Sequence, residues 1–195
     1  MSGKSCAMST FESQKLKIMK KNILIHGLIS GIIVSVFMLA SINYFSHCQG
    51  DVDLETSMLI GYASMLIAFS LVFVGIRSYR ENYNGGVITF GKAFKIGSMI
   101  VLISSTIYVI AWLIDYFFFM PDFMGEYSAM MLEELRASGA SQAEIAAQTK
   151  EMADFGEMYN NPLFNAMMTY MEILPVGLIV TLISSLILRR KTAKN

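Results

Sequence analysis

The sequence predicts an all-α integral membrane protein with four transmembrane helices, both termini in the cytoplasm, and an extracytoplasmic helical hairpin between helices three and four. The composition is the first observation: the 195 residues are 54% hydrophobic and only 15% charged, with a mean hydropathy of +0.52. This is too apolar for a soluble domain of such length. Most of the apolar excess lies in long continuous runs, and charged residues are sorted by sign along the chain.

The apolar runs are long enough to cross a membrane as helices. Runs of about 19 to 24 residues cover about 29 to 36 Å, which matches the hydrocarbon core of a bilayer. Barrel strands would need only about 9 to 11 residues of alternating polarity, which these runs lack. The first run also lacks a small-residue cleavage site, so we expect it to be retained. The predicted spans are residues 23–45, 58–76, 96–119 and 166–188.

The distribution of charge predicts the orientation. Of the 15 basic residues, 13 precede the first span, lie between the second and third, or follow the fourth. The connection between spans one and two carries acids and no Lys or Arg, and residues 120–165 carry eight acids against Arg136 and Lys150. By the positive-inside rule, both termini and the short middle connection are cytoplasmic. The two acidic connections are expected to face outward.

Two segments lie outside the predicted spans. Residues 1–22 form a basic cytoplasmic tail that we expect to attract anionic lipid, and residues 23–195 form the membrane domain. Within the outer insertion 120–165, Ser141 and Glu144 have the spacing of a capping box that starts a helix. Two short helices with apolar stripes are therefore predicted there. The stripes pack on each other or on the membrane surface, or they bind an external partner.

The connection between spans two and three contains the sequence GGVITFGKA, Gly85 to Ala93. Gly86, Gly91 and Lys92 have the spacing of a phosphate loop, but such a loop follows a buried strand and ends in Ser or Thr rather than Ala93. We therefore expect no nucleotide and no nucleic acid as a partner. The segment is interpreted as the cytoplasmic hinge of a membrane hairpin, followed by a short interfacial or re-entrant piece, VITFGKAF. The hinge residues are Arg77, Arg80, Gly85, Gly86, Gly91, Lys92 and Lys95.

A family resemblance becomes specific around this hinge. It is carried by the stretch GYASMLIAFSLVFVGIRSYRENYNGGVITFGKAFKIG, Gly61 to Gly97. This stretch resembles the signature of an uncharacterised bacterial family of four-span inner-membrane proteins, classed as a domain of unknown function. The segments MPDFMGEY, SGASQAEIAAQ, NNPLF and EILPVGLIVTLISSLILRRK resemble the same family, so the resemblance runs from Asn22 onward. It implies four helices in a bacterial inner membrane and leaves the mechanism open.

Charged side chains inside the spans form a candidate intramembrane polar site, because a charge at the centre of the hydrocarbon costs at least about 2.5 kcal/mol. Glu172 lies roughly 9 Å below the outer boundary of the fourth span, and Asp115 lies roughly 6 Å below that of the third. Two carboxylates at similar depth can share a proton, relay protons or bind a cation. Pro175 removes a helical amide and frees carbonyl groups near Glu172. Alternatively, both carboxylates are hydrated near the headgroups and only set the helix register.

Small residues recur every four positions in two of the spans and predict close helix packing. Some of these stripes must close the contacts among the spans. A stripe that is not used in these contacts would face a second copy of the chain. A homo-oligomer is therefore one of the expected assemblies. The residues are Gly27, Gly31 and Ser35 in the first span, and Gly177, Thr181 and Ser185 in the fourth.

Patterns for catalysis and metal binding are weak. His26 and His47 are the only histidines and are predicted on opposite sides of the membrane, so we expect no metal and no cofactor. We also find no nucleophile with a neighbouring base, and we expect no enzyme. Nine of the 16 methionines lie between Met120 and Met171, where thioethers together with His47 and Cys48 offer ligands to Cu(I). Filling of apolar gaps is the alternative use of these methionines.

These patterns favour a small multi-pass protein of the bacterial inner membrane, in contact with the lipid bilayer and without catalytic chemistry. It would act as a scaffold, or it would bind a membrane or periplasmic protein partner. The alternative is a minimal proton- or cation-coupled transporter, or a channel-like oligomer, that uses Glu172 and Asp115.

Overall fold

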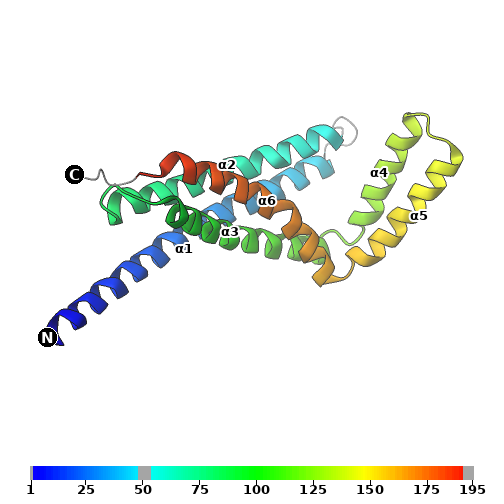
Figure 1. The fold of residues 1–195 in the computed structure, drawn as a ribbon. Coiled ribbons are helices and arrows are strands. Elements are labelled where there is room, and N and C mark those ends of the chain that lie inside the picture. The colour runs from blue at the N-terminus through cyan, green and yellow to red at the C-terminus, as the bar shows by residue number, and fades with distance from the viewer. Residues whose placement is uncertain (1, 48–53, 191–195) are drawn as a thin grey trace. The chain divides into compact units, whose positions relative to one another are not determined.

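The computed structural model describes the backbone of residues 2–47 and 54–190, and the side chains of residues 13–42 and 58–190. Within these ranges the chain forms six α-helices and no β-strand, apart from an isolated bridge between Ile88 and Arg190 (Figure 1). The predicted all-α class is confirmed for these ranges. The helices are α1 Ser2–His47, α2 Leu54–Tyr83, α3 Phe90–Phe118, α4 Phe123–Ala137, α5 Gln142–Tyr159 and α6 Pro162–Leu188.

Four of the helices are long and apolar enough to cross a membrane. The corresponding segments are Ser13–Ile42, Met58–Tyr83, Phe90–Phe118 and Pro162–Leu188. Large apolar side chains such as Ile32, Ile67 and Ile187 are exposed on these helices. Extended exposed apolar faces suit lipid better than water. The four helices therefore indicate a multi-pass membrane protein.

The helices continue past the apolar runs that define the predicted spans. α1 begins at Ser2, so the predicted basic tail is helical along nearly its whole length. α3 begins at Phe90, so the segment VITFGKAF supplies one bridge residue and the first turn of α3. The prediction of a piece separate from the third span is therefore wrong, because most of the segment belongs to α3. Its position at the membrane interface stays a prediction. Hydropathy marks where hydrocarbon ends, whereas a helix continues wherever its backbone hydrogen bonds are maintained.

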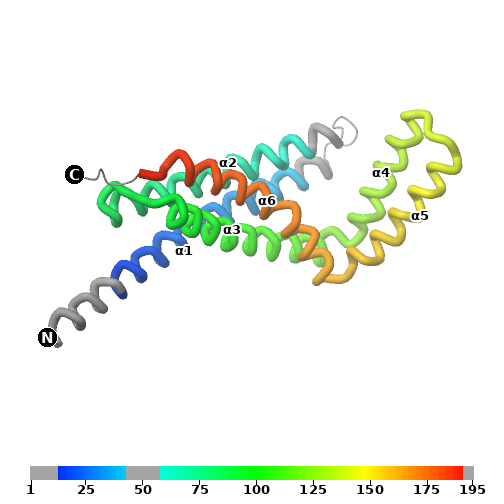
Figure 2. Tube along the Cα trace, in the orientation of Figure 1, coloured from blue at the N-terminus to red at the C-terminus, as the bar shows by residue number. Residues whose placement is uncertain are grey.

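The chain divides into two compact units, which are described separately. Unit 1 comprises Met1–Tyr108 and Glu172–Asn195, and unit 2 comprises Val109–Met171. Figure 2 allows the chain to be followed from α3 through α4 and α5 into α6. Helices α3 and α6 thus contribute residues to both units.

The interior of unit 1 is built from regular stripes along its helices. On α2 the stripe includes Phe69, Val72, Ile76 and Tyr79, all almost fully buried. These positions are three or four residues apart, which places them on one helical face. On α3 the corresponding buried stripe consists of Ala93, Ile96, Ile100, Ser104 and Tyr108.

Glycines allow α1 to lie close to α3. A Cβ atom added at Gly27 would lie 2.9 Å from Cβ of Ile103, and one added at Gly31 would lie 3.1 Å from Cα of Ser104. On α6, an added Cβ at Gly177 would lie 3.1 Å from Cζ of Phe69. A side chain at any of these positions would force its neighbours to shift, so the glycines allow the close approach of the helices.

All six small residues of the predicted stripes are buried within the chain. They are Gly27, Gly31, Ser35, Gly177, Thr181 and Ser185. The two stripes are therefore used for packing inside the protein. A homo-oligomer would need a different surface.

Side-chain to backbone hydrogen bonds also join the helices of unit 1. Ser30 Oγ on α1 donates to the carbonyl oxygen of Ala68 on α2 at 2.9 Å. Ser104 Oγ on α3 lies 3.0 Å from the carbonyl oxygen of Gly27 on α1. Hydroxyl groups of this kind satisfy their own polarity while joining apolar helices.

Unit 2 contains the consecutive helices α4 and α5, which contact each other. Gly139, with φ of +83°, lies in the turn between them. The predicted capping box is confirmed, because Ser141 Oγ accepts from the amide of Glu144 at 3.3 Å and the carboxylate of Glu144 accepts from the amide of Ser141 at 2.8 Å. We call residues 123–159 the α4–α5 insertion.

Candidate functional site

The hinge between α2 and α3 turns through two glycines with positive φ. Gly85 has φ of +65° and Gly86 has φ of +76°, a conformation that favours glycine. The amide of Gly86 donates to the carbonyl oxygen of Arg80 at 2.9 Å, which closes the end of α2. Asn84 Nδ2 donates to the carbonyl oxygen of Val87 at 2.5 Å. The turn is therefore held by several hydrogen bonds.

Lys92 is used inside this turn. Its Nζ atom donates to Asn84 Oδ1 at 3.1 Å and lies 4.9 Å from the ring centroid of Tyr79. Tyr79 is only 2% exposed, so the ammonium group lies over a fixed aromatic surface. In a phosphate loop the corresponding lysine would reach a nucleotide, whereas here it stabilises the turn.

The hinge also holds the end of α6. The amides of Ile88 and Arg190 donate to each other's carbonyl oxygens at 3.0 and 2.9 Å. Arg80 Nη1 donates to the carbonyl oxygen of Leu188 at 3.0 Å, which satisfies one of the open carbonyls at the helix C-terminus. Arg80 also forms an ion pair with Glu81. Two distant parts of the sequence, residues 80–88 and 188–190, therefore meet at this end of unit 1.

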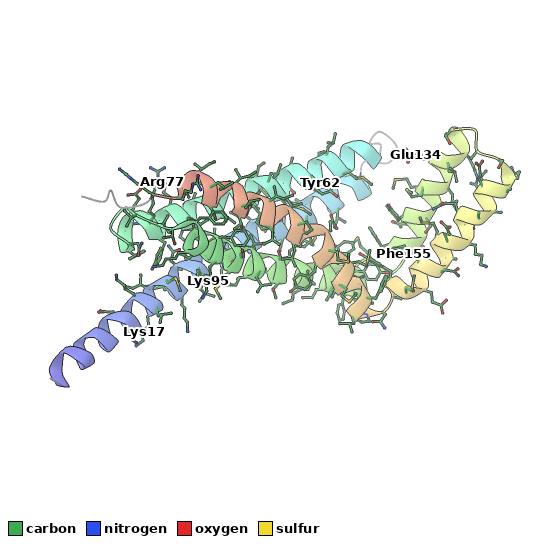
Figure 3. The ribbon with its side chains drawn as sticks, in the orientation of Figure 1. Lys17, Tyr62, Arg77, Lys95, Glu134 and Phe155 are labelled. Atoms are coloured by element: carbon green, nitrogen blue, oxygen red, sulfur yellow. The ribbon has the colours of Figure 1, made fainter. Side chains whose placement is uncertain are left out.

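The other hinge residues point outward. Arg77, Gly91 and Lys95 are exposed, and Figure 3 shows Arg77 and Lys95 toward the same end of unit 1, with Tyr62 farther along α2. We call this the basic end of unit 1. Exposed cations of this kind suit a surface of anionic lipid headgroups.

The intramembrane candidates lie on different units. Asp115 is a partly exposed residue of α3 in unit 2, and Glu172 is an exposed residue of α6 in unit 1. The predicted pairing of these carboxylates therefore stays a prediction. Pro175 lies inside α6, which is continuous from Pro162 to Leu188.

Glu172 lies on an otherwise apolar face of α6. Ile179 and Ile183, about two and three turns further along, are 58% and 51% exposed. Glu172 also lies about 24 Å along the helix axis from Leu188, the last residue of α6. An ionised carboxylate that lies this far along a span and faces lipid has a high free energy, unless it is protonated or another protein surface packs over it.

Unit 1 also buries polar groups that the sequence interpretation did not single out. Among the described side chains, the hydroxyls of five residues are buried without a hydrogen-bond partner: Ser35, Ser98, Ser105, Thr181 and Ser185. The side-chain amide oxygen of Asn22 is also buried without a hydrogen-bond partner. The sequence identified Ser35, Thr181 and Ser185 only as small packing residues. Serine and threonine occur both in packing motifs and in polar sites, so the residue type alone does not distinguish the two.

Asn22 lines a pocket of about 270 Å³ together with residues of α1 and α2. Polar neighbours in this pocket are Lys21, His26 and Ser78. The sequence contains a signal for it, since Asn22 and His26 are one turn apart where the apolar run of α1 begins. Sequence alone did not indicate that Ser78 of α2 would face them.

Aromatic rings and two asparagines form the base of the α4–α5 insertion within unit 2. Trp112 Nε1 donates to Asn165 Oδ1, and the Tyr116 hydroxyl donates to Asn160 Oδ1, each at 2.9 Å. The ring of Phe123 lies edge-on to Trp112 with centroids 5.2 Å apart. Buried aromatic clusters with satisfied polar atoms provide rigid anchors. Further ring contacts involve Tyr127, Phe155, Tyr159 and Phe164.

Beyond this base the insertion is open to its surroundings. α4 has no buried residue, and Met130 and Met158 are 47% and 49% exposed. A shallow groove of about 480 Å³ lies near the turn, lined partly by Glu144, Gln148 and Glu151. All eight carboxylates of the insertion region are exposed: Asp122, Glu126, Glu133, Glu134, Glu144, Glu151, Asp154 and Glu157.

Metal ligands do not gather in the described part of the chain, where no three His, Cys, Asp or Glu residues could hold one ion together. His47 and Cys48, the suggested partners of the methionines for Cu(I), lie outside the residues whose side chains are described. Glu144 has a lowered pKa because hydrogen bonds from the backbone and side chain of Ser141 stabilise its charged form.

Comparison with known proteins agrees with the resemblance found in the sequence. Neither the curated proteins nor the solved structures contain a match to the chain. A family model described as a protein of unknown function, DUF4199, matches residues 25–190, which is most of the chain. The match includes the first apolar segment from residue 25 onward, the other three apolar helices in full, and the α4–α5 insertion. The protein therefore belongs to the DUF4199 family of proteins of unknown function.

Proposed function

We propose that this protein is a non-catalytic, multi-pass protein of the bacterial inner membrane that binds a protein partner through the α4–α5 insertion. The observation that carries the proposal is the exposed face of α4. Glu126, Met130 and Glu133 are all exposed and are spaced at i, i+4 and i+7, so they lie on one side of the helix. This face combines two carboxylates with a flexible apolar side chain.

A similar combination occurs on α5. Glu151, Asp154 and Met158 are exposed there at i, i+3 and i+7. Across residues 120–165, eight carboxylates stand against Arg136 and Lys150. Of the salt bridges among described side chains, the structure records only Arg80 with Glu81. Apart from Glu144, which accepts a hydrogen bond in the capping box, these carboxylates are therefore available to a cationic partner.

The partner that fits this surface is a basic, amphipathic segment of a membrane or periplasmic protein. Lys and Arg would meet the carboxylates, and an apolar side chain would contact the methionines, which adapt readily to irregular surfaces. The aromatic base supports this role, because a rigid support lowers the entropy lost on binding. Charge complementarity would act mainly on the association rate and the choice of partner.

Site-specific photocross-linking in native membranes tests the proposal. A photoreactive side chain at Met130 should yield a defined cross-linked protein, whereas one at the lipid-exposed position Ile67 should not. Glu126→Lys with Glu133→Lys should lower the yield by about tenfold, because like charges would then face each other. Raising the salt concentration should also lower it, because exposed charges are screened.

The matched control carries the same charge change on α5, Glu151→Lys with Asp154→Lys. A smaller loss in this variant would assign the contact to α4. A yield that is insensitive to both charge reversal and salt would contradict the proposed chemistry of the partner. Absence of any product at Met130 above the Ile67 background would contradict partner binding by this face.

A second candidate function is proton or cation transport by an oligomer. It is favoured by the exposed position of Glu172 on an apolar helix face, since a second copy of the chain would cover the carboxylate. Proton and cation flux into liposomes should then disappear in Glu172→Gln and Asp115→Asn at equal protein content. No flux in the parent protein would exclude this function under those conditions.

A further inference from the structure

The pocket between α1 and α2 contains an unusual polar group. Asn22 is 6% exposed, and its Nδ2 atom donates to Ser78 Oγ at 3.3 Å. Its Oδ1 atom is buried and accepts no hydrogen bond from any described residue. Buried polar atoms nearly always have a partner in native proteins. Asn22 also lines the pocket, and a buried acceptor without a partner in a pocket residue points to a ligand that donates.

His26 also lines this pocket. Its Nδ1 atom lies 2.9 Å from the carbonyl oxygen of Asn22. Because a carbonyl oxygen only accepts, Nδ1 carries the shared proton, and Nε2 of the neutral ring is an acceptor. The ring lies against Gly75, where an added Cβ would be 3.1 Å from Cγ of His26. The orientation of the imidazole is thus restricted by both contacts.

A cation completes the set of groups. Lys21 also lines the pocket and is exposed. Asn22 and Lys21 directly precede the buried residue Ile23, where the apolar run of α1 begins. The pocket therefore lies near the boundary between headgroups and hydrocarbon at the basic end of unit 1. Its volume of about 270 Å³ is close to the lower limit of small-molecule pockets.

We propose that this pocket binds the headgroup of an aminoethyl phosphate ester, with the lipid phosphatidylethanolamine as its source. The ammonium group would donate to Asn22 Oδ1 and His26 Nε2, and the phosphate would accept from Lys21. An ammonium has three N–H donors, which matches a pocket with two acceptors. A choline headgroup has the same charges and no N–H donor, so the pocket would discriminate against it.

Lipid retention by the full-length protein tests this assignment. Protein in detergent is mixed with equal amounts of phosphatidylethanolamine and phosphatidylcholine of identical acyl chains, and bound lipid is measured by native mass spectrometry. We expect about tenfold preference for phosphatidylethanolamine, since loss of hydrogen bonds at buried acceptors strongly penalises the other ligand. Lipids with one and two N-methyl groups should show intermediate retention. This ligand series does not depend on the folding of any variant.

Protein variants locate the site. Asn22→Leu and His26→Phe should each abolish most of the preference, and Lys21→Gln should weaken retention of both lipids. Lys20→Gln is the matched control, because Lys20 is an adjacent exposed cation that does not line the pocket. Thermal unfolding of each variant shows whether a loss of lipid retention arises from misfolding.

Each alternative has a distinct result. Equal retention of the two lipids by the parent, or a preference unchanged in Asn22→Leu and His26→Phe, would overturn the proposal. Stronger retention of phosphatidylglycerol would overturn the assignment of an ammonium donor. Competition by free phosphoethanolamine at micromolar concentration would show that the ligand is a soluble ester rather than a lipid.

Discussion

At the scale of single residues, the positions without side chains set how closely the helices of unit 1 approach. Gly31 is the clearest case, because an added Cβ would lie 2.9 Å from Cβ of Ile107 and 3.1 Å from Cα of Ser104. One of these atoms belongs to the backbone and cannot move independently. Even the smallest side chain at Gly31 should therefore force α1 away from α3.

Gly31→Ala should accordingly destabilise the protein by about 1–3 kcal/mol, the usual cost of overpacking. Gly61→Ala is the matched control in α2, since no atom lies within 4 Å of an added Cβ there. That variant should be as stable as the parent or more stable, because Ala favours helix. Thermal unfolding in detergent compares the two. Equal destabilisation by both substitutions would argue against the close approach of α1 and α3.

The carboxylate of Glu144 gives a prediction on pH at the same scale. Its pKa is lowered by hydrogen bonds from the backbone amide and then the hydroxyl of Ser141. The capping box therefore contributes stability above the pKa of unfolded Glu, and this contribution is lost as the pH falls through the lower folded pKa. Ser141→Ala should move the Glu144 pKa toward its ordinary value, as measured by carboxyl NMR in micelles. An unchanged titration would mean that the hydroxyl has no effect.

At the scale of elements, the base of the α4–α5 insertion combines rings with buried amides. Asn165 is fully buried, accepts from Trp112 Nε1 at 2.9 Å and donates to the carbonyl oxygen of Tyr159 at 3.3 Å. It therefore links α3, α5 and α6 within unit 2. Asn160 makes a similar bond to Tyr116, but Asn160 is exposed.

Asn165→Leu should leave the buried indole N–H of Trp112 without its acceptor, at a cost of about 1–3 kcal/mol. Faster amide exchange in α4 and α5 should follow, measured by hydrogen exchange on the full-length protein. Asn160→Ala should have a much smaller effect, because water can replace the lost bond. Equal exchange in Asn165→Leu and the parent would show that the insertion is ordered by other contacts.

Several elements could be predicted from local sequence alone. The capping box at Ser141 was recognisable because its hydrogen bonds join residues three apart. The beginning of α3 could not be recognised in this way, because the preceding residue Ile88 pairs with Arg190 near the other end of the sequence. No local pattern of residues contains that pairing.

At the scale of the whole molecule, orientation in the membrane is a prediction from charge. Basic residues lie at one end of unit 1, and the insertion in unit 2 carries the excess of acids. Lys95→Cys and Glu134→Cys, both exposed positions, should report opposite sides in a background without Cys6 and Cys48. A membrane-impermeant thiol reagent applied to intact spheroplasts should label Glu134→Cys only. Labelling of Lys95→Cys in intact spheroplasts would reverse the predicted topology.

The sequence by itself determined the number of long apolar helices, the approximate position of the apolar run in each, and the family. Length and hydropathy are sufficient for this, because a bilayer of fixed thickness demands a fixed length of apolar helix. It also indicated the hinge and the two short helices, since turns and caps depend on neighbouring residues.

Only the tertiary structure decided which side of α2 and of α3 faces inward, whereas the stripes of small residues already predicted the packing faces of α1 and α6. In a membrane both faces are apolar, so periodicity of hydrophobic residues gives little information about the interior. Gly31, Ser104 and Thr181 face inward because close packing and hydrogen bonding, rather than hydropathy, select the contacts of α1, α3 and α6. The pocket at Asn22 likewise depends on Ser78, which is 56 residues away along the chain. Contacts of this range arise from packing between helices, and hydropathy along one helix does not specify them.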